Sequence, residues 1–224
     1  MANFIIATIK PWNIAEYLNQ VDSLPGVWHL IDKKEDFTLE KISALNPEKI
    51  FFPHWSWIVP EKILSRYECV CFHMTDLPYG RGGSPLQNLI VRGHTSTYLT
   101  ALKMTEELDA GPIYLKSKIT LDGSAQEIFT RVAARIYDLI REIIAGAVEP
   151  QPQQGDVVEF ERRHPEQSLV PQVADLYKLY DHIRMLDAET YPKAYIDCGA
   201  YKIELTEAKL EQGELKATAK IKLT

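Results

Sequence analysis

The sequence predicts an α/β protein with a doubly wound, mostly parallel, Rossmann-like sheet and a small C-terminal α+β appendage. Short apolar runs alternate with segments of helical spacing through the first two thirds of the chain. The first run, "NFIIAT", is fully apolar, which is typical of a parallel strand covered on both faces. With 224 residues, 46% of them hydrophobic, the chain is long enough to bury a core.

Each element of the first half follows from its local pattern. Strands are expected where apolar runs are short, at residues 3–8, 26–32, 49–55 and 68–73. Helices are expected at residues 14–21, 37–46 and 60–67, where apolar residues recur with helical spacing. Thr38 is a candidate cap for the second helix, and Pro60 begins the third. The fourth strand, "ECVCFH", ends on His73.

The middle of the chain continues the pattern. We expect a helix at residues 84–93 that Gly93 closes, a strand at 95–104, and a turn followed by a strand within 106–121. Residues 124–146 form a long amphipathic helix: Ser124 caps it, Glu127 completes a capping box, and Gly146 ends it.

Composition divides the chain near residue 150. The stretch "AVEPQPQQGD", residues 147–156, is rich in proline and glutamine and has no apolar period, so it predicts a linker. We therefore expect a catalytic domain at residues 1–150 and a small C-terminal subdomain at 151–224. The subdomain holds a helix near 172–187 and, from the alternation at 193–223, a small antiparallel sheet.

Charge and cysteine content limit the classes of partner. The formal net charge of -6 and the pI near 5.6 disfavour nucleic acid as a partner. The three cysteines, Cys69, Cys71 and Cys198, provide neither a disulfide framework nor a zinc-binding pattern, so no metal is expected and a reducing cytoplasm is the expected location. We expect no membrane span and no signal peptide.

Two residues that follow strands are candidates for chemistry. His73 ends a strand before a loop rich in glycine and proline, and Asp109 precedes Ala110-Gly111 after the strand at 95–104. A lone histidine is more often structural, and an aspartate in such a turn usually only shapes it. If both lie at the carboxyl edge of one sheet, however, the carboxylate orients the imidazole and the pair moves protons.

Three segments together resemble a known family. "FHMTDLPYGRGGSP" is similar to the His-x-Ser-Leu-Leu-Pro-x-x-Arg-Gly-x-x-Pro segment of the folate-dependent formyltransferases, and "EELDAGPIYL" resembles their Leu-Asp-x-Gly segment. "WIVPEKIL" is similar to their Ile-Leu-Pro turn before a short helix. The resemblance covers roughly residues 48–170 and implies the formyltransferase fold, with N10-formyltetrahydrofolate as the cofactor.

The resemblance also implies catalytic roles. His73 would stabilise the oxyanion of the tetrahedral intermediate, and Asp109 would hold the histidine and relay the proton that the amine loses. Cys71 stands where the family usually has an asparagine that donates to the oxyanion, and a thiol is a weak donor. Either Thr75, Gln87 or Asn88 takes this role, or the enzyme is slow, or the chain is no enzyme. The alternative for Cys71 is a small buried hydrophobe.

Further residues are expected around the two substrates, each with a structural alternative. The resemblance assigns the cofactor to Trp57, Ile58, Val59, Thr105, Glu106 and Glu107. It assigns the acceptor to Arg81, Gly82, Gly83, Gln87, Asn88, Arg162, Arg163 and Tyr191. The alternatives are core packing for the aromatic residues and a solvated surface for the arginines.

The favoured function is transfer of the formyl group to the amine of a nucleotide-linked amino sugar, on a pathway of the pseudaminic-acid type. "FERRHPEQS" resembles a segment that follows the catalytic domain in such enzymes and in the transfer-RNA enzyme. The alternatives are methionyl-tRNA formyltransferase, whose C-terminal domain is larger and basic, a formyl hydrolase, and a non-catalytic folate or nucleotide-sugar binding module. A homodimer through the C-terminal sheet stays open.

Overall fold

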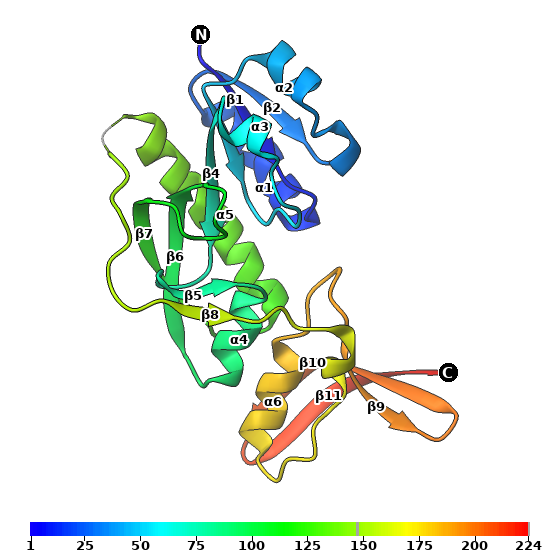
Figure 1. Ribbon diagram of the computed structural model, residues 1–224. Coiled ribbons are helices and arrows are strands. Elements are labelled where there is room, and N and C mark those ends of the chain that lie inside the picture. The colour runs from blue at the N-terminus through cyan, green and yellow to red at the C-terminus, as the bar shows by residue number, and fades with distance from the viewer. Residues whose placement is uncertain (147, 224) are drawn as a thin grey trace. The chain divides into compact units, whose positions relative to one another are not determined.

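The structure is a computed structural model that describes residues 1–146 and 148–223. Its largest sheet has six strands in the order β2-β1-β3-β4-β6-β7 (Figure 1). These are β1 (Asn3–Ala7), β2 (Val27–Ile31), β3 (Lys49–Phe52), β4 (Glu68–His73), β6 (Ser96–Lys103) and β7 (Ile113–Thr120). The accompanying helices are α1 (Pro11–Gln20), α2 (Leu39–Leu45), α3 (Glu61–Leu64) and α5 (Ala125–Ile144), with short 3₁₀ turns η1 (Val21–Ser23) and η2 (Lys34–Asp36). The predicted α/β class with a mostly parallel sheet is confirmed.

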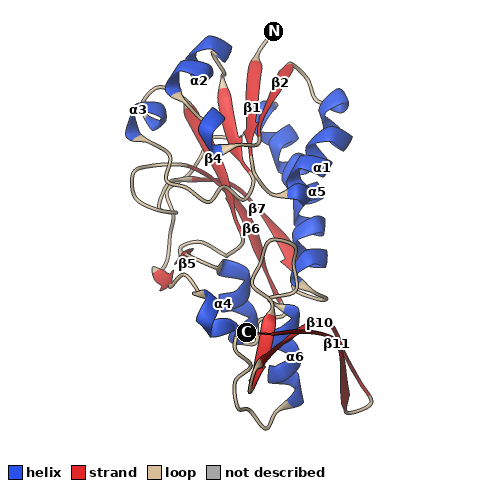
Figure 2. Cartoon of the chain, turned by 90° about the vertical axis from the view of Figure 1, so that its right-hand side faces the viewer, coloured by secondary structure: helices blue, strands red, loops and turns tan. Residues whose placement is uncertain are grey.

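Helices cover both faces of this sheet, with α1 and α5 on one side and α2 and α3 on the other (Figure 2). Because successive strand residues point to opposite faces, neighbouring apolar residues enter different cores. Ile5, Ile50 and Cys69 pack with Ile42 of α2 and Ile63 of α3. On the other face, aromatic rings stack across four strands, in the order Phe4, Trp28, Phe51 and Phe72. A strand buried on both faces needs the continuous apolar runs from which the sequence predicted it.

The strand β6 departs from the parallel arrangement of β1 to β4. β4 is parallel to β3 but antiparallel to β6, with Val70 opposite Lys103 and His73 opposite Thr100. The loop after β6 therefore starts beside Val70, about 10 Å along the strand from His73. The expectation that His73 and Asp109 meet because both follow strands at one carboxyl edge was wrong. Asp109 reaches His73 because the loop at 104–112 runs back along β4.

The predicted helix ends are confirmed where side chains form them. The Thr38 side chain accepts a hydrogen bond from the Lys41 amide at the start of α2. Ser124 and Glu127 form the capping box of α5: the Ser124 amide donates to the Glu127 carboxylate at 2.7 Å, and the Glu127 amide donates to Ser124 Oγ at 3.3 Å. Gly146, with a φ of 72°, follows the last turn of α5.

The sequence did not predict a pair of short strands, β5 (Tyr79–Gly82) and β8 (Val158–Phe160), which form a two-stranded sheet. The expected linker at 147–156, of which residue 147 lies outside the described residues, also makes backbone contacts with the large sheet. Gln151 exchanges two backbone hydrogen bonds with Ile113, at 2.7 and 2.8 Å. The segment is therefore attached to the strand β7.

The chain packs into two compact units. The first contains residues 1–82, 98–119 and 130–159, and the second contains 83–97, 120–129 and the chain from Phe160 onward. The second unit includes α4 (Pro85–Val91), η3 (Pro165–Ser168), α6 (Leu176–Arg184) and the antiparallel sheet of β9 (Ala194–Cys198), β10 (Tyr201–Glu211) and β11 (Glu214–Leu223). The boundary expected near residue 150 stays a prediction. Among the described residues, no helix is both long and apolar enough to cross a bilayer.

Candidate functional site

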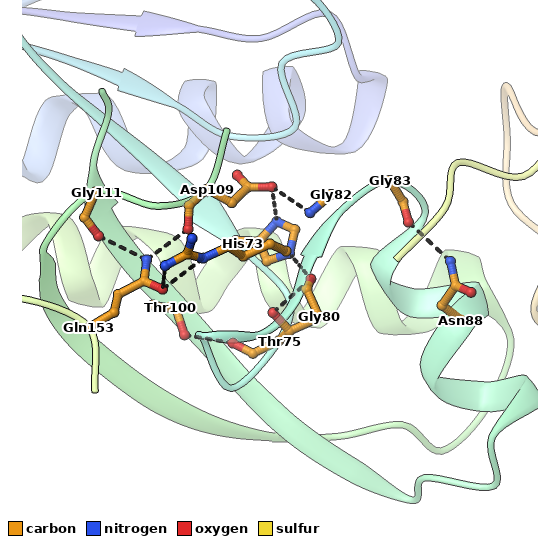
Figure 3. A network of polar contacts seen from close by, with 11 residues as sticks. His73, Thr75, Gly80, Gly82, Gly83, Asn88, Thr100, Asp109, Gly111 and Gln153 are labelled. Carbon is orange, nitrogen blue, oxygen red and sulfur yellow. Dashed lines mark hydrogen bonds and ion pairs between the residues drawn. The ribbon is translucent and has the colours of Figure 1, made fainter. Parts of the chain in front are cut away.

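His73 and Asp109 lie next to each other in the first unit (Figure 3). His73 Nδ1 is 3.5 Å from Asp109 Oδ2, and only 9% and 11% of the two side chains are exposed. On the other side of the ring, His73 Nε2 lies 2.7 Å from the carbonyl oxygen of Gly80. Because a carbonyl oxygen only accepts hydrogen bonds, this contact places a proton on Nε2.

The position of Asp109 gives His73 a partner with which it can exchange a proton. With Nε2 protonated, a neutral imidazole would direct the lone pair of Nδ1 toward the Asp109 carboxylate, and the two would repel each other. One proton on Nδ1 or on the carboxyl group removes this repulsion. A proton that the pair takes up can therefore pass between the histidine and the aspartate, which is the property required to accept a proton and pass it on.

The Asp109 backbone is in the left-handed region, with a φ of 54°. Aspartate tolerates this conformation better than most residues, but contacts elsewhere must maintain it. The Gly82 amide donates to Asp109 Oδ2 at 3.0 Å, so the carboxylate has a backbone partner as well as His73. The loop approaches the backbone of β6 so closely at Gly111 that a Cβ there would lie 1.7 Å from the Lys103 carbonyl oxygen.

Two buried threonines hold the turn that follows His73 (Figure 3). Thr75 Oγ1 donates to the Gly80 carbonyl at 3.3 Å, and Thr100 Oγ1 donates to the Thr75 carbonyl at 2.6 Å. Both side chains are fully buried. Thr75, one of the expected replacements for the missing oxyanion donor, thus donates its hydroxyl proton to the backbone.

Cys71, at the position where the family usually has asparagine, lies on β4. Burial raises the pKa of its thiol well above the ordinary value, and the negative charge of Asp109 raises it further. A thiol in this environment stays protonated, which excludes it as a thiolate nucleophile at neutral pH. It remains a weak hydrogen-bond donor, and its role stays a prediction.

The other two expected replacements lie in the second unit. Gln87 is buried and donates from Nε2 to the Met185 carbonyl at 3.0 Å. Asn88 donates from Nδ2 to three backbone carbonyls, those of Gly83, Ser84 and Glu161, at 3.0, 3.1 and 2.9 Å. Both amide groups bind the backbone of their own unit.

The residues assigned to the cofactor lie on two segments of the first unit. Trp57 packs edge-on against Trp55 with ring centroids 5.0 Å apart, and Lys34 Nζ lies 5.3 Å from the Trp57 ring centroid. Ile58 is 90% exposed, whereas Val59 is buried. Thr105, Glu106 and Glu107 are exposed in the loop that carries Asp109. Their role in cofactor binding stays a prediction.

Arg81, expected to bind the acceptor, makes its contacts with protein groups. Its Nε and Nη2 atoms donate to Gln153 Oε1 at 3.1 and 2.9 Å, and Nη1 contacts Glu107 Oε1 at 3.1 Å. Gln153 was missed from the sequence because no local pattern distinguishes it from its neighbours in "QPQQ". Gly82, in the same group of expected residues, donates its amide hydrogen to Asp109.

The remaining residues assigned to the acceptor belong to the second unit. A Cβ on Gly83 would lie 2.5 Å from Arg162 Cβ, so glycine permits this close approach. Arg163 donates from Nη2 to the Gln167 carbonyl at 2.6 Å, and burial lowers the pKa of its guanidinium. Tyr191 stacks on Phe129 at 5.3 Å, and burial raises its pKa to about 12. Their roles toward a substrate stay predictions.

His54 is a second histidine near the candidate site, close enough to His73 for the two to interact electrostatically. Its pKa is lowered from 6.5 to about 3, mainly by burial and also by the positive charge of Lys10 and by the nearby His73. His54 is therefore neutral at physiological pH. It also has a left-handed backbone, with a φ of 56°.

This shift predicts a pH dependence of stability. The unfolded chain binds a proton on His54 below about pH 6.5, whereas the folded protein binds it only near pH 3. The free energy of unfolding should thus lose about 1–2 kcal/mol from this group between pH 7 and pH 5. His54→Asn, which tolerates the left-handed backbone and does not titrate, should flatten this slope in urea titrations. An unchanged slope would show that His54 is not the cause.

Within residues 1–146 and 148–223, no group of three or more His, Cys, Asp or Glu side chains could hold a metal ion.

Comparison with known families finds two matches along the chain. Residues 28–148 match the formyl transferase family, and residues 165–222 match the C-terminal domain of methionyl-tRNA formyltransferase. The methionyl-tRNA formyltransferase of Bacillus pumilus is 27% identical over 183 residues, which are 78% of this chain and 57% of that protein. The chain spans about half the length of the curated relatives it matches.

Among solved structures, a methionyl-tRNA formyltransferase from Clostridium thermocellum is 44% identical, with a TM-score of 0.97 and complete coverage of both chains. A sugar N-formyltransferase from Shewanella is 16% identical, with a TM-score of 0.73, and covers 95% of this chain and 100% of its own. The second likeness concerns the fold alone.

These matches overturn the expected acceptor. We expected a nucleotide-linked amino sugar and no nucleic acid, because the net charge is negative and the C-terminal segment is small. A protein of the same extent that is named a methionyl-tRNA formyltransferase shows that the small segment does not exclude the tRNA enzymes. Net charge describes the average field of the whole chain and does not exclude a local basic surface. The formyl transferase match alone covers more than half of the 224 residues, and the chain therefore belongs to the formyl transferase family.

Proposed function

We propose that this protein transfers a formyl group from N10-formyltetrahydrofolate to the amino group of methionyl-tRNA. The observation that carries the proposal is the 44% identity, over the full length of both chains, to a solved methionyl-tRNA formyltransferase. The adjacent His73 and Asp109 support a reaction in which a proton must be removed. The cytoplasmic location expected from the sequence is part of the same proposal.

The residues near the end of β3 fit a flat, hydrogen-bonding ring system. Within the described part of the chain, the buried indole nitrogen of Trp55 has no hydrogen-bond partner. Trp57 lies beside it and is half-buried. A bound pterin would offer an acceptor to the Trp55 N–H and a face to these rings. N10-formyltetrahydrofolate would supply an activated formyl group, with Trp55 and Trp57 holding its ring.

In this proposal Asp109 removes the proton from the acceptor. An amine attacks a formyl carbon only when it is neutral. The transfer forms a new C–N bond, breaks the bond from the formyl carbon to the donor nitrogen, and moves one proton from the amine to that nitrogen overall. The Asp109 carboxylate, held by the Gly82 amide and adjacent to His73 Nδ1, receives that proton. His73 stabilises the product of this transfer by sharing the proton across the 3.5 Å contact. Donation from His73 to an oxyanion, as expected from the family, requires Nε2–H to leave the Gly80 carbonyl.

A transfer assay with purified protein tests the proposal. We expect N10-formyltetrahydrofolate and methionyl-tRNA to give formylmethionyl-tRNA, detected by mass spectrometry after release of the amino acid. Uncharged tRNA, free methionine and a UDP-linked amino sugar should give no formylated product. Formate release without transfer would identify a hydrolase, and the absence of both products would overturn the proposal.

A further inference from the structure

The loop that carries Asp109 needs external support. Residues 104–112 connect β6 to β7 without regular secondary structure, and residues 105–108 are all exposed. The left-handed backbone of Asp109 is not a conformation that a free loop would hold permanently. Because the candidate mechanism depends on the 3.5 Å contact with His73, a group that fixes this loop also fixes the reacting geometry.

Gln153 binds the loop at the two carbonyls that flank Ala110 (Figure 3). Its Nε2 donates to the Asp109 carbonyl at 2.7 Å and to the Gly111 carbonyl at 2.9 Å. These two bonds use both N–H groups of the side-chain amide. They restrain the backbone on either side of Ala110 and hence the direction of the Asp109 side chain.

Arg81 fixes the orientation of the Gln153 amide. The Gln153 Oε1 atom accepts from Arg81 Nε and Nη2, at 3.1 and 2.9 Å. A guanidinium can only donate, so the amide oxygen must face Arg81 and the amide nitrogen must face the loop. The side chain of Arg81 is only 14% exposed, which limits competition from water.

The segments that carry Arg81 and Gln153 hold the side chain and the backbone of Asp109, respectively. Arg81 directly precedes Gly82, whose amide donates to the Asp109 carboxylate, while Gln153 holds the Asp109 carbonyl. The carboxylate of Asp109 is thus held from β5 and its backbone from the segment before β8. The contact between Arg81 and Gln153, 72 residues apart in the sequence, joins these two segments. The contact from Gln153 is with the Asp109 backbone and not with the carboxylate that takes up the proton.

We propose that Gln153, oriented by Arg81, is a positioning residue that holds the Asp109 carboxylate against His73 for formyl transfer. The inference rests on the proposed function for its kinetic consequences, and on the contacts alone for its structural ones. Gln153→Ala should lower kcat by about 10²-fold, because the loop relaxes away from His73, with a much smaller change in KM for methionyl-tRNA. The neighbouring Gln154→Ala, at an exposed position, is the matched control and should behave as the wild type.

A second variant separates the two functions of the amide. Gln153→Glu keeps an oxygen for Arg81 but removes both N–H donors to the loop. We expect it to recover the thermal stability lost in Gln153→Ala and to leave kcat low. Recovery of kcat in Gln153→Glu would show that the contact with Arg81, not the hold on the loop, matters.

Hydrogen exchange of the Gly82 amide gives a readout that needs no activity. This amide donates to Asp109 Oδ2, so it should exchange faster in Gln153→Ala than in the wild type or in Gln154→Ala. Unchanged exchange together with unchanged kcat would overturn the inference. A wild-type protein without transferase activity that still shows faster exchange in Gln153→Ala would overturn only the proposed function.

Discussion

Asp109→Asn is expected to lower formyl transfer by about 10²- to 10⁴-fold with little effect on the fold. Asparagine has nearly the same shape, and its side-chain oxygen can still accept from the Gly82 amide. It cannot take up the proton that the acceptor amine loses. His73→Ala should have an effect of similar size, because it removes the partner of the Asp109 carboxylate. Single-turnover rates with methionyl-tRNA measure both effects.

Asp76→Asn is the matched control for this prediction. Asp76 lies three residues after His73 and pairs at 2.6 Å with Lys116, with 52% of its side chain exposed. It carries the same charge, and an exposed pair of this kind contributes little to stability. The control should keep wild-type rates. Full activity in either Asp109→Asn or His73→Ala, with an unchanged melting temperature, would remove the acid–base mechanism.

Gly111→Ala is expected to reduce both stability and turnover. The new Cβ would lie 1.7 Å from the Lys103 carbonyl oxygen and 2.9 Å from the Lys103 carbonyl carbon, so the backbone must move. Relieving such a clash typically costs about 1–3 kcal/mol. The shift occurs two residues after Asp109, and we expect kcat to fall by on the order of 10²-fold. Urea denaturation measures the first effect, and initial rates measure the second.

Gly213→Ala is a control that should lower stability without displacing the loop that carries Asp109. Gly213 lies in the turn between β10 and β11 with a φ of 80°, and a Cβ there would meet nothing within 4 Å. Gly213→Ala should cost about 1–2 kcal/mol through its left-handed backbone alone. It should retain the wild-type kcat under conditions where it stays folded. If Gly111→Ala retains the wild-type kcat as well, the close approach at Gly111 does not control the position of Asp109.

The sequence predicted the two central residues of the candidate site but not the residues that support them. His73 and Asp109 were expected as a pair, and their contact is the central feature of the site. Gln153 was not expected, because a glutamine in a segment rich in proline and glutamine carries no local mark of a partner 44 residues away. Arg81 was expected to bind a ligand. Its contact with Gln153 was not expected, because the sequence does not relate two positions 72 residues apart.

The sequence by itself determined the features that depend on neighbouring residues. Apolar periodicity marks strands and helices, and caps such as Thr38 and Ser124 act on amides only three residues away. Tertiary structure alone decided the antiparallel direction of β6, the course of the loop at 104–112, and the contact between Gln153 and the Asp109 backbone. The apolar pattern of a strand is the same in either direction, and a backbone carbonyl is present at every residue. Which of these carbonyls meets Gln153 therefore depends on packing between distant segments, which local chemistry does not specify.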